Sequence, residues 1–493
     1  MPDPLAVVPY ALAAAGGRVD AAGSSDSAGV QHFDAGQLTA AGLTLLRRSA
    51  PLVRALAGRR AAILLPTSPA FLVALAACEG RGAVLVNPLA APPEIADQLA
   101  DADVGAVFTI GALAARLPAG TPHVLLDAVP AAARVVAADG TTRDLDLAAH
   151  AGDALALEGS RGAEGRDEEA AVVYTSAMRG RSLGAVLTHR NLLSNARATV
   201  EAGGLRADDH ALAVLPFSHL FGLVVAGLAP LLAGARVTTM ARFNPITAAD
   251  LIARGGVTFL VGVPAVFAAL VQAAERRGGL GANALRTCIC GGAPLPVALQ
   301  ERWHAVTGAE LRQGYGLTEA GPVCLFNRVD RPNRRGTLGV PFPGVAVAVR
   351  DEQTGAPCAT GARGEICVCG PNVGPGYVSG GADGLGRWPD VPRDSWLRTG
   401  DLGSADADGY VTFHGVCKPM FTRNGFNVYP RELERVVGAM PGVRHVTVRA
   451  VPDPAREHDI ALDVQGGVTP DAVKAWCAAR LSAYKQPSEI TVR

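Results

Sequence analysis

The chain has 493 residues, with 45 lysine plus arginine residues balanced by 45 aspartate plus glutamate residues, so its formal net charge is zero. This length predicts at least two folding units, and the balanced charge argues against nucleic acid or an anionic membrane as a partner. Its apolar runs are too short for a membrane span, and no basic segment precedes the apolar N-terminal stretch, so we expect a cytoplasmic protein without a secretory leader.

Residues 1 to about 330 alternate Ala- and Leu-rich helical segments with short apolar strands, such as 61–65 and 82–86. This alternation predicts an α/β fold in which helices cover parallel sheets. The low-complexity Ala/Gly stretch at 131–166 is typical of a surface loop or linker.

From about residue 335 the chain is punctuated by Gly and Pro, which predicts a small β subdomain with strands at 344–350, 364–368 and 409–414. The last part has a different pattern, which predicts helices at 431–440 and 470–481 and strands at 443–451 and 489–492. We therefore expect an N-terminal portion of residues 1–417, with its β subdomain at about 335–417, and an α+β unit of residues 418–493.

Nine scattered cysteines do not suggest a disulfide framework. Cys288 with Cys290, and Cys367 with Cys369, are each spaced i, i+2 within strand-like runs. This spacing puts both thiols on one strand face, whereas zinc knuckles use C-x2-4-C. We expect buried strand cysteines.

The first chemical motif begins at residues 172–176, a predicted strand that runs into the small-residue segment 177–184. Residues 188–192 then open a predicted helix. A strand, a loop and a helix start present backbone N–H groups to phosphate. Taken alone, the pattern fits an ordinary strand-to-helix connection equally well.

Further motifs follow in a fixed order: Leu-Pro-Phe-Ser-His-Leu-Phe-Gly at 215–222, Gly-Gly-Ala-Pro at 291–294, Gly-Tyr-Gly-Leu-Thr-Glu-Ala at 314–320, Trp-Leu-Arg-Thr-Gly-Asp-Leu at 396–402 and Gly-Phe-Asn-Val-Tyr-Pro-Arg-Glu-Leu-Glu at 425–434. With these motifs the chain resembles, over essentially its whole length, the adenylate-forming superfamily of acyl-CoA ligases, luciferases and nonribosomal adenylation domains. The resemblance implies two helix-covered sheets and a β subdomain, followed by a small mobile C-terminal domain that begins at the hinge Lys418.

The family reaction has two halves. A carboxylate attacks the α-phosphate of ATP and releases pyrophosphate, and a thiol then attacks the acyl adenylate and releases AMP. The C-terminal domain rotates between the two steps. The resemblance therefore implies acyl adenylate, AMP or ATP, coenzyme A and Mg²⁺ as cofactors, and a small carboxylic acid as substrate. The acceptor thiol, coenzyme A or a carrier protein, is left open.

For the nucleotide, the resemblance implies that Tyr315 stacks on adenine, Asp401 binds the ribose hydroxyls, Thr318 binds the α-phosphate and Glu319 ligates Mg²⁺. A carboxylate offers only acceptors, which suits a diol, and Mg²⁺ takes oxygen ligands. The ordinary alternatives are a core tyrosine, a turn and a helix cap. The remaining predicted nucleotide-binding residues are Thr175, Ser176, Gly291, Gly292, Ala293, Pro294 and Gly316.

His219 stands in an apolar run, where a lone histidine is commonly a core residue. The resemblance implies that it gates the tunnel for the pantetheine arm of coenzyme A, and its apolar neighbours predict a hydrophobic acyl group. The predicted acyl pocket comprises His219, Phe221, Gly222, Val263, Gly291, Gly314, Gly316 and Gly321. The predicted catalytic residues are His219, Thr318, Glu319, Lys418 and Gly425.

The phosphate loop departs from the family pattern. The family reads T-S-G-T-T-G-x-P-K-G, whereas residues 175–184 read Thr-Ser-Ala-Met-Arg-Gly-Arg-Ser-Leu-Gly. Leu183 therefore replaces the lysine, and the Gly-Thr-Thr triplet is lost. Because glycine lets N–H groups approach phosphate and hydroxyls donate to it, we expect weaker pyrophosphate binding.

Two more cationic contacts of the family are missing. Val416 replaces a nucleotide-contacting arginine, and the printed sequence ends at Arg493 before the P-K-T-x-S-G-K segment that carries the adenylating lysine; Lys485 matches an earlier family lysine. Removing one such donor costs about 3 to 4 kcal/mol of transition-state stabilisation. We therefore expect severely slowed adenylation, even though such losses do not add.

The retained residues serve the second half-reaction. We therefore predict an enzyme that converts a preformed acyl adenylate to an acyl-CoA thioester and receives the adenylate from a separate adenylating ligase. Two alternatives stay open. One is a complete ATP-dependent ligase, in which Arg179 or Arg181 replaces the loop lysine and a further C-terminal segment supplies the other. The second is a non-catalytic protein that binds AMP, acyl adenylate or acyl-CoA.

Overall fold

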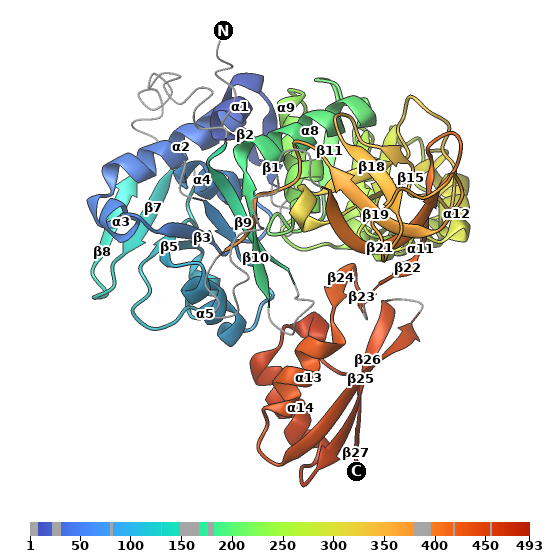
Figure 1. Cartoon of the computed structure of the whole chain (residues 1–493). Helices are drawn as coiled ribbons and strands as arrows, with labels where there is room; N and C mark the ends of the chain where they lie inside the picture. The colour runs from blue at the N-terminus through green and yellow to red at the C-terminus, as the bar shows by residue number, and fades with distance from the viewer. Residues whose placement is uncertain are drawn as a thin grey trace.

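The computed structural model describes residues 8–21, 31–78, 82–129, 131–147, 167–175, 182–378, 396–417, 420–453 and 456–493. These residues form two large sheets with helices, a smaller antiparallel sheet and a C-terminal α+β unit (Figure 1). The predicted α/β fold is confirmed. Within the described ranges, no helix is long and apolar enough to cross a membrane.

The first large sheet has nine strands, with a parallel centre and antiparallel edges. Its central strands are apolar and buried on both faces, as is typical of parallel strands covered by helices. In spatial order the strands are β17 (Val340–Pro341), β16 (Val323–Phe326), β15 (Leu311–Gly316), β14 (Thr287–Cys290), β13 (Phe259–Gly262), β11 (His210–Ala213), β12 (Arg236–Thr239), β1 (Arg18–Ala21) and β2 (Gln31–Asp34).

The second large sheet also has nine strands and the same plan of a parallel centre with antiparallel edges. In spatial order they are β20 (Gly376–Tyr377), β10 (Leu183–Thr188), β9 (Glu169–Thr175), β4 (Ala83–Leu85), β3 (Arg60–Ile63), β5 (Val104–Thr109), β6 (His123–Leu125), β7 (Ala132–Val136) and β8 (Thr142–Asp146).

Helices cover both sheets, and the largest apolar core joins residues of α2, α4 and α8 with strands of both sheets. Phe71 on α4 meets Phe217 edge to face, with ring centroids 5.7 Å apart. The helices of this portion are α1 (Val8–Ala15), α2 (Ala35–Arg48), α3 (Ala50–Ala55), α4 (Pro69–Ala77), α5 (Pro92–Asp101), α6 (Gly111–Ala114), α8 (His189–Gly203), the π-helix η3 (Phe221–Leu228), α9 (Ala229–Leu232), α10 (Pro245–Ala253), α11 (Pro264–Arg277), α12 (Val297–Thr307) and the 3-10 turn η4 (Thr318–Ala320).

The prediction of a loop or linker at 131–166 is wrong for residues 132–146. Strands β7 and β8 form an antiparallel pair at the sheet edge there. Ala133, Val135 and Leu145 are buried, while residues between them are exposed, so alternating alanines and valines suffice for a strand with one buried face. Residues 148–166 lie outside the described ranges.

The predicted strand, loop and helix around residues 172–192 need a correction. Helix α8 does begin after Thr188, which caps it together with Asn191. However, β10 separates the loop from this helix and pairs antiparallel with β9. A strand of six residues spans about 20 Å, so the N-terminus of α8 lies too far away to present its N–H groups to a phosphate in that loop.

A four-stranded antiparallel sheet follows the two large sheets, in the order β18-β19-β21-β22. Its strands are β18 (Ala346–Arg350), β19 (Gly364–Cys369), β21 (Leu397–Ala405) and β22 (Val411–Val416). The expected strands at 344–350, 364–368 and 409–414 are confirmed. Strand β21, which carries the 396–402 motif, was not predicted.

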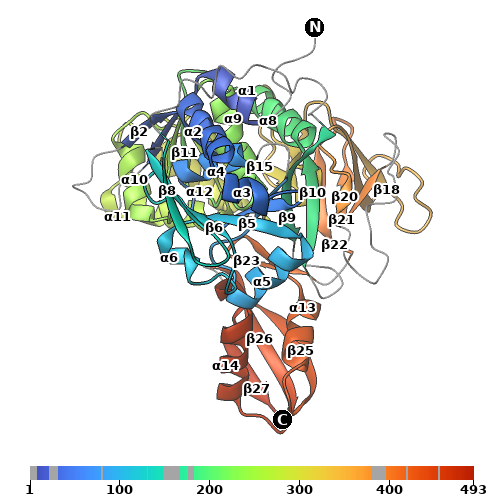
Figure 2. The same cartoon turned by 90° about the vertical axis from the view of Figure 1, so that its left-hand side faces the viewer.

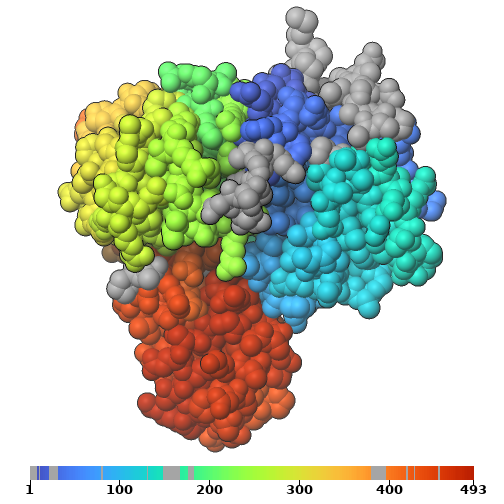
Figure 3. Space-filling model, turned by 180° about the vertical axis from the view of Figure 1, so that it is seen from behind, coloured from blue at the N-terminus to red at the C-terminus, as the bar shows by residue number. Residues whose placement is uncertain are grey.

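The C-terminal unit projects as a separate lobe (Figures 2 and 3) and has its own apolar core. Its elements are β23 (Phe421–Arg423), β24 (Phe426–Val428), α13 (Pro430–Gly438), β25 (Val443–Asp453), β26 (Glu457–Gly466), α14 (Pro470–Arg480), the 3-10 turn η5 (Ala483–Lys485) and β27 (Glu489–Val492). The two predicted helices and two predicted strands are present, whereas β26 and the β23–β24 hairpin were not predicted. The expected hinge Lys418 lies outside the described residues, so the boundary stays a prediction.

Candidate active site

The motif segments meet at one edge of the first large sheet. Strands β11, β13, β14 and β15 are parallel, so their carboxyl ends lie side by side. Residues 214–222, Val263, 291–294 and 317–320 directly follow these four strands. In open α/β sheets this edge is where ligands bind.

Tyr315 and Asp401 are brought together from different sheets. The Tyr315 hydroxyl donates a hydrogen bond to Oδ2 of Asp401, with the two oxygens 2.6 Å apart. Burial raises the pKa of Asp401 to about 6 and raises the pKa of Tyr315 well above its ordinary value. At neutral pH Asp401 is therefore mostly ionised, and a carboxylate can accept further hydrogen bonds from a diol.

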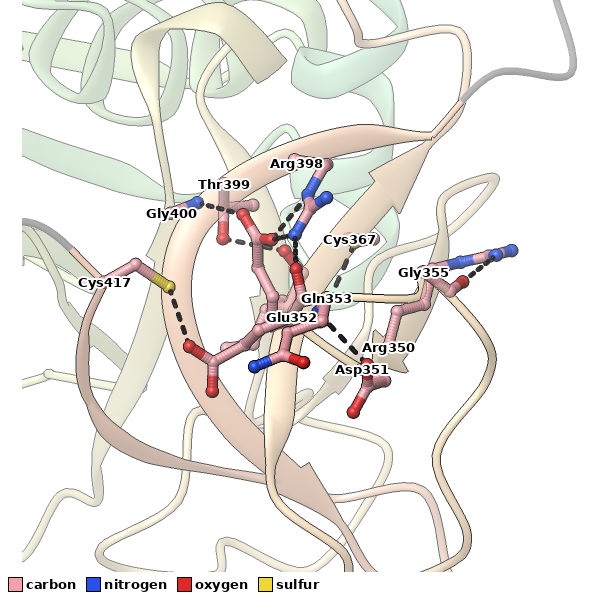
Figure 4. Close-up of polar contacts among 12 residues, drawn as sticks. Arg350, Asp351, Glu352, Gln353, Gly355, Cys367, Arg398, Thr399, Gly400 and Cys417 are labelled. Carbon is pink, nitrogen blue, oxygen red and sulfur yellow. Dashed lines mark hydrogen bonds and ion pairs between the residues drawn. The ribbon is translucent and has the colours of Figure 1, made fainter.

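Residues 398–400 of β21, directly before Asp401, are held by hydrogen bonds to the neighbouring strand β19 (Figure 4). The Gly400 N–H donates to Oε1 of Glu365 at 2.9 Å. The Thr399 hydroxyl donates to the Ile366 carbonyl at 2.8 Å and accepts the Asp401 N–H at 3.1 Å. Arg398 donates to Glu365 at 2.6 Å. The Asp401 carboxylate is thus held on a fixed strand rather than on a free loop.

Glu319 and Tyr377 form the second pair of the site. The Tyr377 hydroxyl donates to Oε1 of Glu319 at 2.6 Å, and burial together with this carboxylate raises the pKa of Tyr377. Sequence analysis missed Tyr377, because nothing in a Gly-Tyr dipeptide 58 positions from Glu319 indicates that the two side chains meet.

The Mg²⁺ that the family implies fits this site only as an ion that is bound together with a nucleotide. Across the ranges that the structure covers, no group of three or more His, Cys, Asp or Glu side chains could hold a metal. Mg²⁺ commonly keeps several waters and binds one or two carboxylates plus substrate phosphates. Glu319 therefore suits an ion that arrives with a nucleotide, and not a protein cage.

Tyr429 extends the site from the C-terminal unit. It is the residue that precedes α13, and burial together with the negative charges of Glu319 and Asp401 raises its pKa. The C-terminal unit thus places a phenol near both predicted nucleotide-binding carboxylates. Tyr429 lies in the 425–434 motif, but sequence analysis did not single it out.

Three predicted acyl-pocket residues meet at the ends of β14 and β15. A Cβ placed on Gly291 would lie 3.1 Å from Cζ of Phe221 and 3.0 Å from the carbonyl oxygen of Gly314. Any larger residue at 291 would displace the Phe221 ring. The three residues are therefore packed against one another.

His219 is half-buried two residues before this phenylalanine. The Phe221 N–H donates to its Nδ1 at 3.2 Å, so the ring proton belongs on Nε2. Burial lowers the pKa of His219 to about 4. The imidazole is neutral at physiological pH and suits an apolar wall or gate better than an ionic contact.

Other predicted glycines lie against backbone instead. A Cβ would meet the Pro216 carbonyl at Gly222, the Pro322 carbonyl at Gly316 and the Asn372 carbonyl at Gly321. These three glycines permit close chain packing near the site, and the structure does not bring them to the Phe221 side chain. Thr318 begins η4 next to Glu319, Ala293 and Pro294 follow β14, and Thr175 ends β9; Ser176 and Lys418 lie outside the described residues.

Gly425 brings the C-terminal unit to the same edge. It forms the turn of the β23–β24 hairpin with Asn424, and both have the positive φ that a tight type I′ turn requires, 53° and 75°. A Cβ on Gly425 would lie 2.6 Å from Cγ1 of Val263, and the Gly425 carbonyl lies 3.7 Å from the Cβ position of Gly292. The hairpin tip therefore sits directly on the ends of β13 and β14.

The residues that depart from the family pattern can also be placed. Val416 pairs with Asp401 across β21 and β22, so both side chains lie on one face about 5 Å apart at Cβ. Leu183 pairs with Thr175 at the base of the phosphate loop. Neither Val416 nor Leu183 supplies a positive charge next to these predicted nucleotide-binding residues.

The cysteine pairs are strand residues as expected. Cys288, Cys290 and Cys367 are buried and Cys369 is half-buried. Burial raises the pKa of Cys288 to about 12, so its thiol stays protonated and inert.

Comparison with known proteins gives a consistent result. Residues 52–378 match the family described as AMP-binding enzyme. The chain is 34% identical over 456 residues to a feruloyl-CoA synthase of Amycolatopsis sp., covering 88% of this chain and 84% of that protein. Among solved structures, a malonyl-CoA ligase in a ternary product complex with methylmalonyl-CoA and AMP is 27% identical, with 99% and 98% of the chains covered and a TM-score of 0.78. ATP-bound MatB from Rhodopseudomonas palustris is also 27% identical, with 98% and 95% covered and a TM-score of 0.64.

The fold and the arrangement of this edge define the class of adenylate-forming enzymes. The chain belongs to the AMP-binding enzyme family and is an enzyme of the acyl-CoA ligase type.

Replacing Asp401 by alanine is expected to weaken AMP binding by about 1 to 3 kcal/mol, because it leaves the Tyr315 hydroxyl and the ribose hydroxyls without an acceptor. Isothermal titration calorimetry with AMP measures this change. The matched control is Asp408→Ala, an exposed aspartate just beyond the end of the same strand. An unchanged affinity in Asp401→Ala would remove Asp401 from the nucleotide site.

Proposed function

We propose that this enzyme forms an acyl-CoA thioester from a preformed acyl adenylate and coenzyme A, and that it makes little adenylate from acid and ATP. The proposal is carried by one observation: Val416, and not a cation, faces Asp401 across the strand pair. Coenzyme A, AMP and a nucleotide-borne Mg²⁺ are the proposed ligands, and a separate adenylating ligase is the proposed partner.

The arrangement of the C-terminal unit supports the thioester-forming step. Gly425 and Tyr429 lie against the predicted acyl and nucleotide residues. The two solved structures have equal identity to this chain, yet the product complex with methylmalonyl-CoA superimposes better over the whole chain than the ATP-bound structure.

The two departures in the described part of the nucleotide site support slow adenylation. Pyrophosphate leaves as a highly charged anion, and its departure is helped by fixed cations. Leu183 and Val416 supply none. In contrast, attack of a thiol on an acyl adenylate needs the adenylate to be held and the thiol to be oriented, and proximity provides much of that rate.

The proposed acid is hydrophobic. Phe221 and Val263 border the proposed acyl pocket, and His219 is neutral there. A relative that is 34% identical is a feruloyl-CoA synthase, so aromatic propenoic acids form the first group to test, with saturated fatty acids and malonate as comparison.

The test measures the two half-reactions separately. Each acid of the panel with ATP should give little pyrophosphate exchange, whereas the correct synthetic acyl adenylate with coenzyme A should give acyl-CoA and AMP. Exchange as fast as thioester formation would contradict the proposal. AMP binding without thioester formation from any adenylate would favour the non-catalytic alternative.

A second candidate function is the complete ligase. It is favoured by the solved MatB structure, which binds ATP and matches 98% of this chain. This candidate predicts robust pyrophosphate exchange with the same acid whose adenylate is converted.

A further inference from the structure

Glu457, at the start of β26, is a carboxylate that the proposed function does not yet use. Its Oε2 accepts the Gly425 N–H at 3.0 Å. Its Oε1 is buried and has no hydrogen-bond partner among the described residues. Burying a carboxylate oxygen without a hydrogen-bond partner costs folding free energy. Because this one lies beside a predicted catalytic glycine, we looked for a function that uses it.

The backbone at Glu457 is also unusual. Its φ is +65°, in the left-handed region that side chains other than glycine and asparagine rarely adopt. This conformation turns the side chain back onto the hairpin of residues 421–428. Strained backbone of this kind is often found at functional sites.

The carboxylate lies behind the turn through which the C-terminal unit contacts the predicted acyl residues. It holds the turn whose Gly425 touches Val263 and Gly292. Burial raises the pKa of the thiol of Cys290, the residue before Gly291, and the negative charge of Glu457 adds to this rise. Glu457 is therefore linked to the ends of β13 and β14 through the turn that it holds.

Within the described ranges, two titratable groups interact electrostatically with Glu457. Cys290 faces it from β14 with a thiol that burial keeps protonated, and His458 follows it on β26. Burial raises the pKa of Glu457, while the backbone N–H groups of Gly425 and Asn424 and the charge of His458 oppose this rise. A carboxylate with a raised pKa is a stronger proton acceptor than an exposed one.

We propose that Glu457 is the proton acceptor for the thiol that attacks the acyl adenylate. This inference rests on the proposed thioester-forming function. The thiol sulfur bonds to the acyl carbon, and the bond from that carbon to the phosphate oxygen breaks. AMP leaves with the negative charge of that oxygen, and the thiol proton passes to Oε1 of Glu457, which later releases it to water.

The test is the pH dependence of thioester formation by Glu457→Gln, measured with coenzyme A and feruloyl adenylate, or with the adenylate of the panel that reacts fastest. Glutamine keeps an oxygen for the Gly425 N–H but cannot take a proton. At pH 7 a thiol of pKa about 8.5 is mostly protonated, so we expect a loss of about 100-fold. Above about pH 9 the thiolate forms without help, and the deficit should shrink toward onefold.

Glu489→Gln, an exposed glutamate of the same unit, is the matched control and should follow the wild-type profile. If Glu457→Gln fails to fold, Glu457→Gly provides the same test, because glycine adopts the positive φ without strain. A deficit that is constant from pH 6 to 10 would overturn the proposal and leave Glu457 a structural support for the hairpin. Absence of thioester formation by the wild type would overturn the proposed function itself, together with this inference.

Discussion

Replacing Val416 by arginine is expected to raise pyrophosphate exchange by about tenfold to a hundredfold. The side chain at 416 lies across the strand pair from Asp401, so an arginine there reaches the predicted ribose and α-phosphate. One well-placed donor is worth about a hundredfold or more in a charge-developing transition state, and a newly introduced one recovers part of that. Exchange of labelled pyrophosphate into ATP in the presence of the preferred acid measures the change.

The control is His414→Arg, which places the same charge at an exposed position of the same strand. This variant should leave exchange unchanged. An equal rise in both variants would attribute the effect to net charge. No rise in Val416→Arg would contradict the assignment of residue 416 to the nucleotide site.

A second large effect is expected at Lys485, which joins the C-terminal unit to the rest of the molecule. Its Nζ lies 2.6 Å from Oε1 of Glu432 within the unit and 2.9 Å from Oε1 of Glu94 on α5. Ser482 also donates to Glu94. The Lys485 and Glu432 side chains are 4% and 7% exposed. Burial disfavours the ammonium, but the negative charges around it outweigh burial and raise the pKa of Lys485.

Lys485→Met is expected to lower the free energy of unfolding by about 3 to 5 kcal/mol, because it leaves the buried Glu432 and the half-buried Glu94 without their cation. Urea denaturation followed by circular dichroism measures the loss. Lys474→Met, at an exposed position on α14, should change little.

Glu94→Gln separates the contact of Lys485 between the units from its contact within the C-terminal unit. The variant removes the charge pair with Glu94 but keeps the Lys485–Glu432 pair, so it should loosen the C-terminal unit with a smaller loss of stability. Faster limited proteolysis between residues 410 and 425 measures this loosening. If Glu94→Gln destabilises the chain as much as Lys485→Met, the pair across the interface would be the main source of the stability.

The fold class could be predicted because it depends on local patterns. Central strands such as β3 and β14 are short runs of apolar residues that are buried on both faces. The edge strands β7 and β8 were not predicted, because they bury only one face and lie in an alanine-rich segment. Strand β10 was not predicted, because its first two residues, Leu183 and Gly184, fall within the segment 177–184 that was predicted as a loop.

The candidate site could be predicted in part. Ordered motifs indicated Tyr315 and Asp401, which form a hydrogen bond in the structure. No pattern in the sequence indicated the contacts between the two units. Glu94 and Lys485 are 391 positions apart, and Glu457 acquires its position from a positive φ and from a hairpin that the sequence did not predict.

The pairing of β21 with β22 connects AMP binding with the orientation of the C-terminal unit. Asp401 pairs with Val416, and the Cys417 N–H donates to the Gly400 carbonyl at 2.7 Å. The strand that carries the predicted ribose-binding carboxylate is therefore bonded to the last residues before the predicted hinge. If AMP affinity differs between two orientations of the C-terminal unit, AMP must shift the population of those orientations by the same factor, since such coupling is reciprocal. Product that stays bound would then hold the unit in the orientation that formed it, and departure of AMP would set the unit free for the next cycle.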